Sequence, residues 1–156
     1  MANGGFELPA VEGNGAFVAD LSCWDLTDSD EAEILTMGSW MAAEGEQSID
    51  LNPNGQAEIS QLMPTEVGSS YKLSFKLSGS LFGPAQDYKV EVYWAGESMG
   101  IFSFNTTGIS AHNMGWQTIE VELPAAVTDL TELRFASRTT GAFGVALDDV
   151  RVGPLN

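Results

Sequence analysis

The chain has 156 residues, 44% of them hydrophobic, and its six Lys and Arg stand against 22 Asp and Glu, a formal net charge of −16 at pH 7. Nucleic acids and anionic membrane surfaces are bound through clustered Lys and Arg, so this charge excludes both as partners. No apolar run approaches the ~20 residues that a membrane-spanning helix needs, and we expect no membrane insertion. The length predicts a single domain, residues 1–156, with a substantial core. The only cysteine, Cys23, excludes an internal disulfide, and we expect it to be a small buried filler.

In chain order, the first predicted strand is the glycine-rich segment Asn3-Gly-Gly-Phe-Glu7. Residues 13–15 and 27–31 are expected to be loops, with Trp24 isolated between them. Asn52-Pro-Asn-Gly55 is a strong turn signal between two strand-like runs. The further predicted strands cover residues 48–51, 57–63, 71–77, 88–94, 102–104, 119–123, 133–135 and 141–152.

The alternation within these runs predicts the fold class. Tyr71, Leu73, Phe75 and Leu77 alternate with polar residues, which indicates a half-buried strand. No window shows helical periodicity, and turn residues recur about every ten positions, which is typical of a β-sandwich. We therefore expect an all-β protein of two antiparallel sheets with the aromatic residues between them.

The last predicted strand carries two adjacent carboxylates, Asp148 and Asp149. Strict alternation places Asp148 on one face with Ala146 and Val150, against apolar neighbours. A partly buried carboxylate needs a partner, and in a chain so poor in Lys and Arg a bound cation is more available than a side chain. We predict that the first and last strands pair, and that Glu7 and Asp148 bind one calcium ion.

A catalytic centre is not expected. His112 is the only histidine and lies in the loop-like segment Ser110-Ala-His-Asn113, with no nucleophile motif around it. Hydrolysis of a glycosidic bond needs two carboxyl groups that face one cleft, whereas the acidic residues here are spread over the chain. We therefore expect no enzymatic activity.

Three aromatic residues are candidates for ligand contact. Tyr93 falls on the face of its strand opposite Val92 and Trp94, so we expect it to be exposed. Trp40, in a loop, and Phe82, beside a Gly-Pro pair, are also expected to be exposed. Exposed aromatic rings stack on sugar rings or contact apolar peptide groups, and these residues are therefore predicted to bind ligand.

The three lysines, Lys89 among them, fall on the outward faces of predicted strands, and so does Arg134. In so acidic a chain, they could form a local patch that receives an anionic sugar or a peptide carboxylate. The alternative is cross-strand pairing with Glu91 and Glu120, worth under about 1 kcal/mol for each pair. The residues alone leave both interpretations open.

Six segments carry a family resemblance, in order and over nearly the whole chain: Asn3–Glu7, Gly45–Leu51, Phe104–Gly108, Asn113–Thr118, Leu133–Ser137 and Ala146–Val150. Together they resemble the bacterial choice-of-anchor C domains. These domains are similar to plant cell-wall proteins catalogued as a domain of unknown function, and more distantly to jelly-roll carbohydrate-binding modules. The resemblance implies a jelly-roll sandwich of the galactose-binding-like type.

The resemblance also implies a calcium ion held between the first strand, a middle loop and the last strand. Carried onto this chain, the ligands would be the side chains of Glu7, Glu44 and Asp148 and the carbonyl oxygens of Gly5 and Gln47. Calcium takes about six to eight oxygen ligands, which suits side-chain and backbone oxygens from three separated segments.

These observations predict an extracellular or cell-surface module that is monomeric and was excised from a larger exported protein. The resemblance implies a non-catalytic carbohydrate-binding module, stabilised by calcium, that binds a polysaccharide or cell-surface glycan. The first alternative is a module of a large calcium-dependent bacterial surface adhesin that binds a peptide or protein partner, such as a peptide C-terminus. The second is a purely structural spacer.

Overall fold

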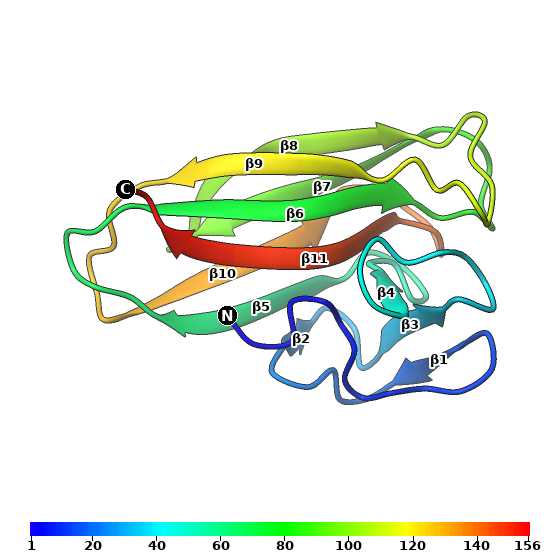
Figure 1. Ribbon diagram of the computed structural model, residues 1–156, viewed down its shortest axis with the longest axis horizontal. Coiled ribbons are helices and arrows are strands. Elements are labelled where there is room, and N and C mark those ends of the chain that lie inside the picture. Colours follow the sequence, from blue (N-terminus) through cyan, green and yellow to red (C-terminus); the bar gives the residue numbers. More distant parts are fainter.

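The computed structural model describes residues 1–156 and consists of two antiparallel β-sheets packed face to face (Figure 1). One sheet has six strands, in the order β1 (Gly15–Val18), β3 (Ala32–Thr36), β4 (Gln47–Asp50), β11 (Val145–Pro154), β6 (Tyr71–Gly79) and β9 (Gln117–Leu123). The other has five strands, in the order β2 (Asp25–Thr27), β5 (Glu58–Pro64), β10 (Leu130–Ser137), β7 (Asp87–Trp94) and β8 (Glu97–Asn105). No helix long and apolar enough to cross a membrane is present. The expected all-β, two-sheet antiparallel sandwich is confirmed.

The core lies between the two sheets and follows the alternation of the sequence. Phe75 and Leu77 of β6 face Val90 of β7 and Phe135 of β10, and all four side chains are fully buried. Phe75 meets Phe135 edge-on, with ring centroids 5.2 Å apart. Burial of each such side chain stabilises the fold by about 1.5–3 kcal/mol, which is why the pattern of period two decides the architecture.

The N-terminal segment is not a strand, so the predicted pairing of the first and last strands is wrong. Residues 3–6 form a turn in which the N–H of Phe6 donates to the carbonyl of Asn3 at 3.2 Å. The segment touches β11 through one backbone hydrogen bond, from Val150 N to Gly4 O at 2.8 Å. Strand β11 instead pairs with β4 and β6. The side chain of Phe6 points into the core and is fully buried, which pins the segment without a sheet ladder.

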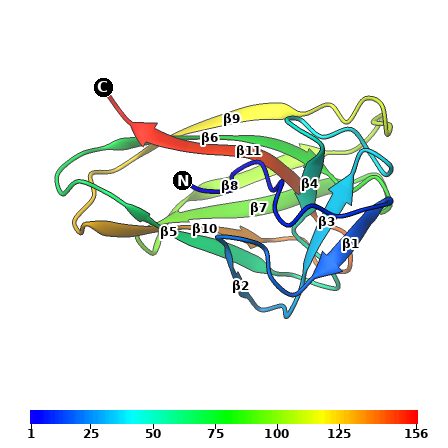
Figure 2. The same cartoon turned by 60° about the horizontal axis from the view of Figure 1, so that its bottom comes forward.

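Two short edge strands, β1 and β2, were not indicated by the sequence pattern. Strand β1 pairs with β3 and β2 pairs with β5, each at the edge of its sheet. Figure 2 shows β1, β3 and β4 running across the long axis of the molecule at one end. Between β1 and β2, Cys23 has a φ of 71° and is exposed, so the expected burial of its side chain is wrong.

A β-bulge in β11 changes the predicted facing of its residues. Pairing with β6 shifts register between Asp148 and Arg151, and Asp149 has a φ of 47°. Because of this extra residue, Val150 turns into the core beside Leu147, whereas strict alternation would place it with Asp148. Asp148 stays on the outer face of the six-stranded sheet and is still fully buried, because a loop covers it.

Candidate functional site

Two loops fold over the outer face of the six-stranded sheet and bury a second, smaller cluster there: Leu35, Trp40, Met114 and Ala146. The loops are tied together by hydrogen bonds from Met41 N to Ala111 O at 2.8 Å and from Trp116 Nε1 to Met41 O at 2.9 Å. Trp40 is only 1% exposed, and its Nε1 donates to Ser48 Oγ at 2.8 Å. The expected exposure of Trp40 is therefore wrong, because its loop returns over the sheet and does not extend into solvent.

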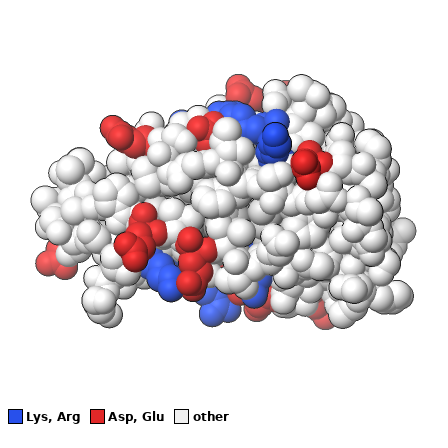
Figure 3. Space-filling view, turned by 90° about the horizontal axis from the view of Figure 1, so that it is seen from above, with Lys and Arg blue, Asp and Glu red and all other residues white.

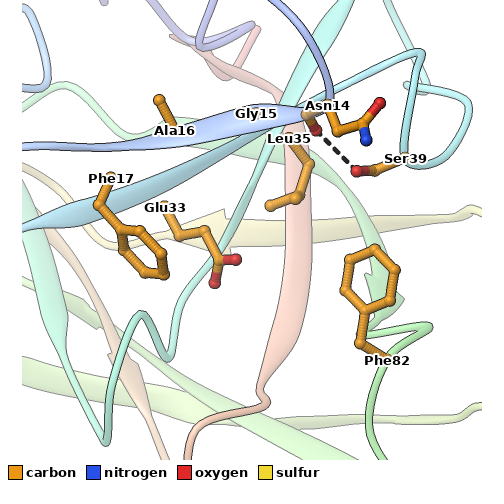
Figure 4. A pocket seen from close by; sticks show the side chains of 8 residues that line it. All are labelled: Asn14, Gly15, Ala16, Phe17, Glu33, Leu35, Ser39 and Phe82. Atoms are coloured by element: carbon orange, nitrogen blue, oxygen red, sulfur yellow. Dashed lines mark hydrogen bonds between the residues drawn. The ribbon is translucent and has the colours of Figure 1, made fainter.

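Beside this cluster lies an open pocket of about 210 Å³ with an aromatic ring at each side (Figure 4). Phe17 of β1 is 49% exposed and Phe82, in the β6–β7 loop, is 55% exposed, which confirms the expected exposure of Phe82. Figure 4 shows the Glu33 carboxylate between the two rings. We call this the Phe17–Phe82 pocket; it is lined by Asn14, Gly15, Ala16, Phe17, Glu33, Leu35, Ser39 and Phe82.

Phe82 is supported from beneath by Trp40. The two ring centroids lie 5.5 Å apart, with the planes tilted by 34°. The buried indole therefore packs against one face of the exposed Phe82 ring. This contact restricts the orientation of Phe82 before any ligand binds.

Glu33 is the only ionisable residue that lines the Phe17–Phe82 pocket. It lies on β3 directly opposite Asp50 of β4. Burial raises the pKa of Glu33 to about 7. Burial also raises the pKa of Asp50 to about 8, assisted by the neighbouring charge of Glu33 and opposed by the backbone N–H groups of Asn52 and Gly144. At neutral pH, the pocket therefore presents a carboxyl group that can donate or accept a hydrogen bond.

Four loops meet at the end of the sandwich next to this pocket, at the right of Figure 1. They are residues 51–57, 80–86, 106–116 and 138–144, which we call the loop end. Asn52 Nδ2 donates to the carbonyls of Thr139 and Gly141 at 2.7 and 2.8 Å, which fastens two of the loops together. Apart from Arg138, the loop end contains no Asp, Glu, Lys or Arg. Figure 3 shows this contrast on one face, where charged side chains become sparse toward the right.

Sequence reasoning did not single out Phe17 or Glu33 as site residues. Phe17 lies in a segment without a clear strand pattern, and Glu33 precedes an apolar pair whose alternation could have placed it outward. Their approach to Phe82 depends on β1, β3 and the β6–β7 loop meeting in space, for which the sequence carries no local signal.

Three predicted metal ligands, Glu7, Glu44 and Asp148, lie around the loop formed by residues 43–47. We call these three carboxylates and the loop the carboxylate junction. Asp148 Oδ2 accepts the backbone N–H groups of Ala43 and Glu44 at 2.8 and 2.9 Å. Its Oδ1 accepts the N–H of Asp149 at 2.7 Å. Burial raises the pKa of Asp148 to about 7 in spite of these donors.

Glu7 holds the other end of the same loop. Its Oε1 accepts the N–H groups of Glu46 and Gln47 at 2.9 and 3.0 Å. The carboxylate of Glu44 lies against Gly5, one of the two predicted carbonyl ligands. No three Asp, Glu, His or Cys side chains lie close enough together to form a metal site by themselves. The structure thus brings the predicted residues to one junction through backbone amides, and the calcium ion stays a prediction.

Tyr93 and Lys89 lie on the opposite side of the molecule, on the outer face of the five-stranded sheet. Val92 and Trp94 are buried, which confirms that Tyr93 faces outward. The Arg134 guanidinium lies 4.0 Å from the centroid of the Tyr93 ring and covers one face of it. The predicted ligand residues are therefore divided between two faces, with Phe82 and Trp40 on one and Tyr93 and Lys89 on the other.

Of the outward cations, Lys72 and Arg134 pair across strands, as one of the two interpretations expected, whereas the other two lysines form no ion pair. Lys72 Nζ lies 2.8 Å from Glu120, and Arg138 Nε lies 2.6 Å from Glu91. Two further pairs, Arg134 with Glu58 at 2.8 Å and Arg151 with Asp149 at 2.6 Å, leave little positive charge for a ligand.

The architecture defines the class of the protein as a jelly-roll β-sandwich, the fold of known carbohydrate-binding modules. TmCBM61 in complex with β-1,4-galactotriose is similar to it, with a TM-score of 0.67 and 18% identity over 99% of this chain and 97% of that chain. A family 35 carbohydrate-binding module from Clostridium thermocellum has a TM-score of 0.56 and 13% identity over 83% of this chain and 90% of that chain. The K1 cleaved adhesin domain of Lys-gingipain from Porphyromonas gingivalis has a TM-score of 0.63 and 13% identity over 93% of this chain and 97% of that chain.

The chain belongs to the family described as "Protein of unknown function (DUF642)", whose family model matches residues 1–153. No curated protein matches the chain. The resemblance to a catalogued domain of unknown function and to jelly-roll carbohydrate-binding modules thus agrees with both comparisons.

Proposed function

We propose that this chain is a non-catalytic carbohydrate-binding module that binds a polysaccharide or cell-surface glycan at the Phe17–Phe82 pocket. The observation that carries the proposal is the pair of exposed phenyl rings at either side of an open hollow, with the Glu33 carboxyl group between them. Sugar rings have apolar faces that pack on aromatic rings and a rim of hydroxyl groups that form hydrogen bonds. The pocket offers both kinds of contact.

The packing of Phe82 on Trp40 supports a role in binding. An exposed ring that moves freely loses conformational entropy when a ligand binds to it, and this loss weakens binding. The Phe82 ring rests on Trp40, which is buried and hydrogen-bonded to Ser48, so less freedom remains to be lost.

The absence of a second carboxyl group facing the pocket supports a binding role over hydrolysis. Glycosidases use two carboxyl groups on opposite sides of the scissile bond. Glu33 lines the pocket, while its neighbour Asp50 is 3% exposed and is held by backbone N–H groups.

The proposal includes an extracellular or cell-surface location and the closer kinship with choice-of-anchor C domains, both of which the sequence resemblance implies.

We also propose that a calcium ion binds at the carboxylate junction, where it would draw the carboxylates of Glu7, Glu44 and Asp148 together, with backbone carbonyls as the further ligands. The donor set suits calcium, which prefers carboxylate and carbonyl oxygens. Arg151, the positively charged residue nearest to Asp148 in the sequence, already pairs with Asp149 at 2.6 Å and does not neutralise Asp148. When bound, the ion would neutralise carboxylates and join the N-terminal segment, the covering loop and β11, which would stabilise the fold.

The binding proposal is tested by isothermal titration and affinity electrophoresis with β-1,4-galactan, xylan and β-1,4-glucan. We expect Phe17→Ala and Phe82→Ala each to lower affinity for the bound polymer about ten-fold or more, the size of one lost aromatic contact in a binding site. Leu62→Ala and Ile101→Ala are matched controls, because these side chains are 58% and 57% exposed on the other sheet.

Release of sugar from any polymer would contradict a non-catalytic role. Binding of peptides with free C-termini in place of every polymer would favour the adhesin alternative. Equal loss of binding in the control variants would show that the pocket is not the binding site.

A further inference from the structure

We infer that the Phe17–Phe82 pocket selects uncharged glycans and rejects glycans that carry carboxylates, with Glu33 forming hydrogen bonds to sugar hydroxyl groups. This inference rests on the proposed carbohydrate-binding function and names the class of ligand. It follows from the distribution of charge around the pocket, over the loop end and across the rest of the surface.

The pocket itself contains no group that would neutralise an anionic sugar. Its lining includes no Lys, Arg or His, and Glu33 is its only ionisable member. The nearest ionisable neighbour across the strand pair is Asp50, a second acid. A uronic acid bound between the two phenyl rings would place its carboxylate beside Glu33 without a counter-charge, and the juxtaposition of like charges is unfavourable whenever Glu33 is ionised.

The loop end extends this neutral surface. The chain carries 28 Lys, Arg, Asp and Glu in total, yet the four loops together contain only Arg138. That residue is already engaged, because its Nε lies 2.6 Å from Glu91 and its Nη2 donates to Tyr93 Oη at 2.8 Å. A polymer that runs from the pocket across the loop end would therefore meet hydroxyl, amide, aromatic and backbone groups, together with the single imidazole of His112.

The remaining cations do not form an alternative site for an anionic polymer. Four of the six pair with a carboxylate: Lys72 with Glu120, Arg134 with Glu58, Arg138 with Glu91 and Arg151 with Asp149. Lys76, whose Nζ donates to the neutral hydroxyl group of Thr118, and Lys89 have no carboxylate partner, and they lie on different sheets. Two isolated cations on a chain of charge −16 give a polyanion no patch to bind.

The chemistry of Glu33 suits hydroxyl groups. Because burial raises its pKa to about 7, the carboxyl group is present in both protonation states near neutral pH. It can accept a hydrogen bond from a hydroxyl group or donate one to it, and every hydroxyl group of a neutral sugar can take either part. A carboxylate ligand can only accept a hydrogen bond. It therefore finds a donor only in the protonated form of Glu33 and is repelled by the ionised form.

The test uses polymer pairs that differ in charge and share a backbone. Hydroxyethylcellulose is paired with carboxymethylcellulose, and methyl-esterified pectin with polygalacturonate; β-1,4-galactan is added as a further neutral polymer. Affinity is measured at pH 7 and 0.15 M salt for the wild-type chain, Glu33→Gln and Glu66→Gln. Glu66 is an exposed residue at the opposite end of the sandwich, so its variant makes the same chemical change, from carboxyl group to amide, without touching the pocket.

We expect at least one neutral polymer to bind, and each anionic partner to bind about ten-fold or more weakly than its neutral counterpart, equivalent to about 1.4 kcal/mol. Glu33→Gln should reduce the ratio of the affinity for the neutral polymer to that for its anionic partner, and it should weaken binding of the neutral polymer. Glu66→Gln should change neither quantity. Thermal unfolding confirms that each variant is folded, and the wild-type comparison remains decisive if Glu33→Gln is not.

The possible failures are distinguishable. Binding of anionic polymers as tightly as their neutral partners would overturn the inference and leave the proposed function standing. A neutral preference that is unchanged in Glu33→Gln would overturn the role of Glu33. Lack of binding to every polymer would overturn the proposed function, and the inference with it.

Discussion

The exposed phenyl ring of Phe82 rests on the buried indole of Trp40, with ring centroids 5.5 Å apart and planes tilted by 34°. Trp40 is held in turn by the hydrogen bond from its Nε1 to Ser48 Oγ at 2.8 Å. A side chain of the second, outer cluster thus determines where a surface ring of the pocket stands. The stability of that cluster and the affinity of the pocket should therefore change together.

Trp40→Phe tests this link. The substitution removes the indole N–H and leaves the Ser48 hydroxyl group, which is fully buried, without its partner. We expect the free energy of unfolding to fall by about 1–3 kcal/mol, and polysaccharide affinity to fall because Phe82 loses its support. Chemical denaturation and titration with the bound polymer measure the two effects.

Ser48→Ala in the Trp40→Phe background is the control. Removal of the orphaned hydroxyl group should recover part of the lost stability, because a buried polar group without a partner is more costly than an apolar one. If the double variant is less stable than Trp40→Phe by the full cost of the Ser48→Ala single variant, the hydrogen bond does not contribute as described.

The acids Glu33 and Asp50 predict an unusual dependence of stability on pH. Both have folded-state pKa values above their ordinary values, about 7 and about 8, because burial penalises the charged forms; Asp148, raised to about 7 for the same reason, adds to the effect. The folded state therefore binds more protons than the unfolded state between about pH 4 and 8, and the free energy of unfolding falls as pH rises through that window. The slope approaches about 1.4 kcal/mol per pH unit for each group.

Asp50→Asn isolates this effect. An amide oxygen can still accept the N–H groups of Asn52 and Gly144, while the side chain no longer ionises. Thermal melts from pH 5 to 9 should show a flatter decline in the variant than in the wild type. Glu91, whose pKa is lowered by Ser98 and Arg138, acts in the opposite direction at lower pH and so lies outside this range. Parallel profiles for variant and wild type would contradict the assignment to Asp50.

Calcium at the carboxylate junction predicts a response to chelation. We expect excess calcium to raise the melting temperature and chelator to lower it, since a ligand at 100 times its Kd stabilises the folded state by about 2.7 kcal/mol. Asp148→Asn should lower the melting temperature in calcium and largely abolish the response. Glu46→Gln, an exposed change in the same loop, should keep it. A response that persists in Asp148→Asn would remove that residue from the metal site.

Tyr93→Ala distinguishes ligand binding at the Phe17–Phe82 pocket from ligand binding on the five-stranded sheet. The sequence pattern predicts that this ring contacts ligand, whereas the proposed pocket lies on the other sheet. If the pocket is the binding site, the variant should bind polysaccharide as the wild type does. We expect it to lose about 0.5–1 kcal/mol of stability, because Arg134 no longer stacks on the ring. A large loss of polysaccharide affinity with little loss of stability would instead support binding on the five-stranded sheet.

Much of the fold was predictable because it depends on local alternation. Strands such as β6 and β7 bury every second side chain, and the period of two is written directly into residues 71–77 and 88–94. The outward position of Tyr93 followed from the same pattern, whereas the exposure of Phe82 was expected from its place beside a Gly-Pro pair. The N-terminal segment failed this reasoning, because burial of Phe6 and side-chain hydrogen bonds, such as that from Trp24 Nε1 to Asn3 O, hold it in a turn that has no sheet ladder.

By itself, the sequence determined the all-β class, the two-layer core and the scarcity of positive charge, since these depend on composition and on the facing of neighbouring residues. Only the tertiary structure decided the candidate site. Phe17, Glu33 and Phe82 come from an edge strand, an inner strand and a loop, and their meeting depends on long-range packing of the six-stranded sheet. Trp40 became a buried support because its loop folds back over the sheet, and Asp148 became buried because the same loop donates backbone amides to it.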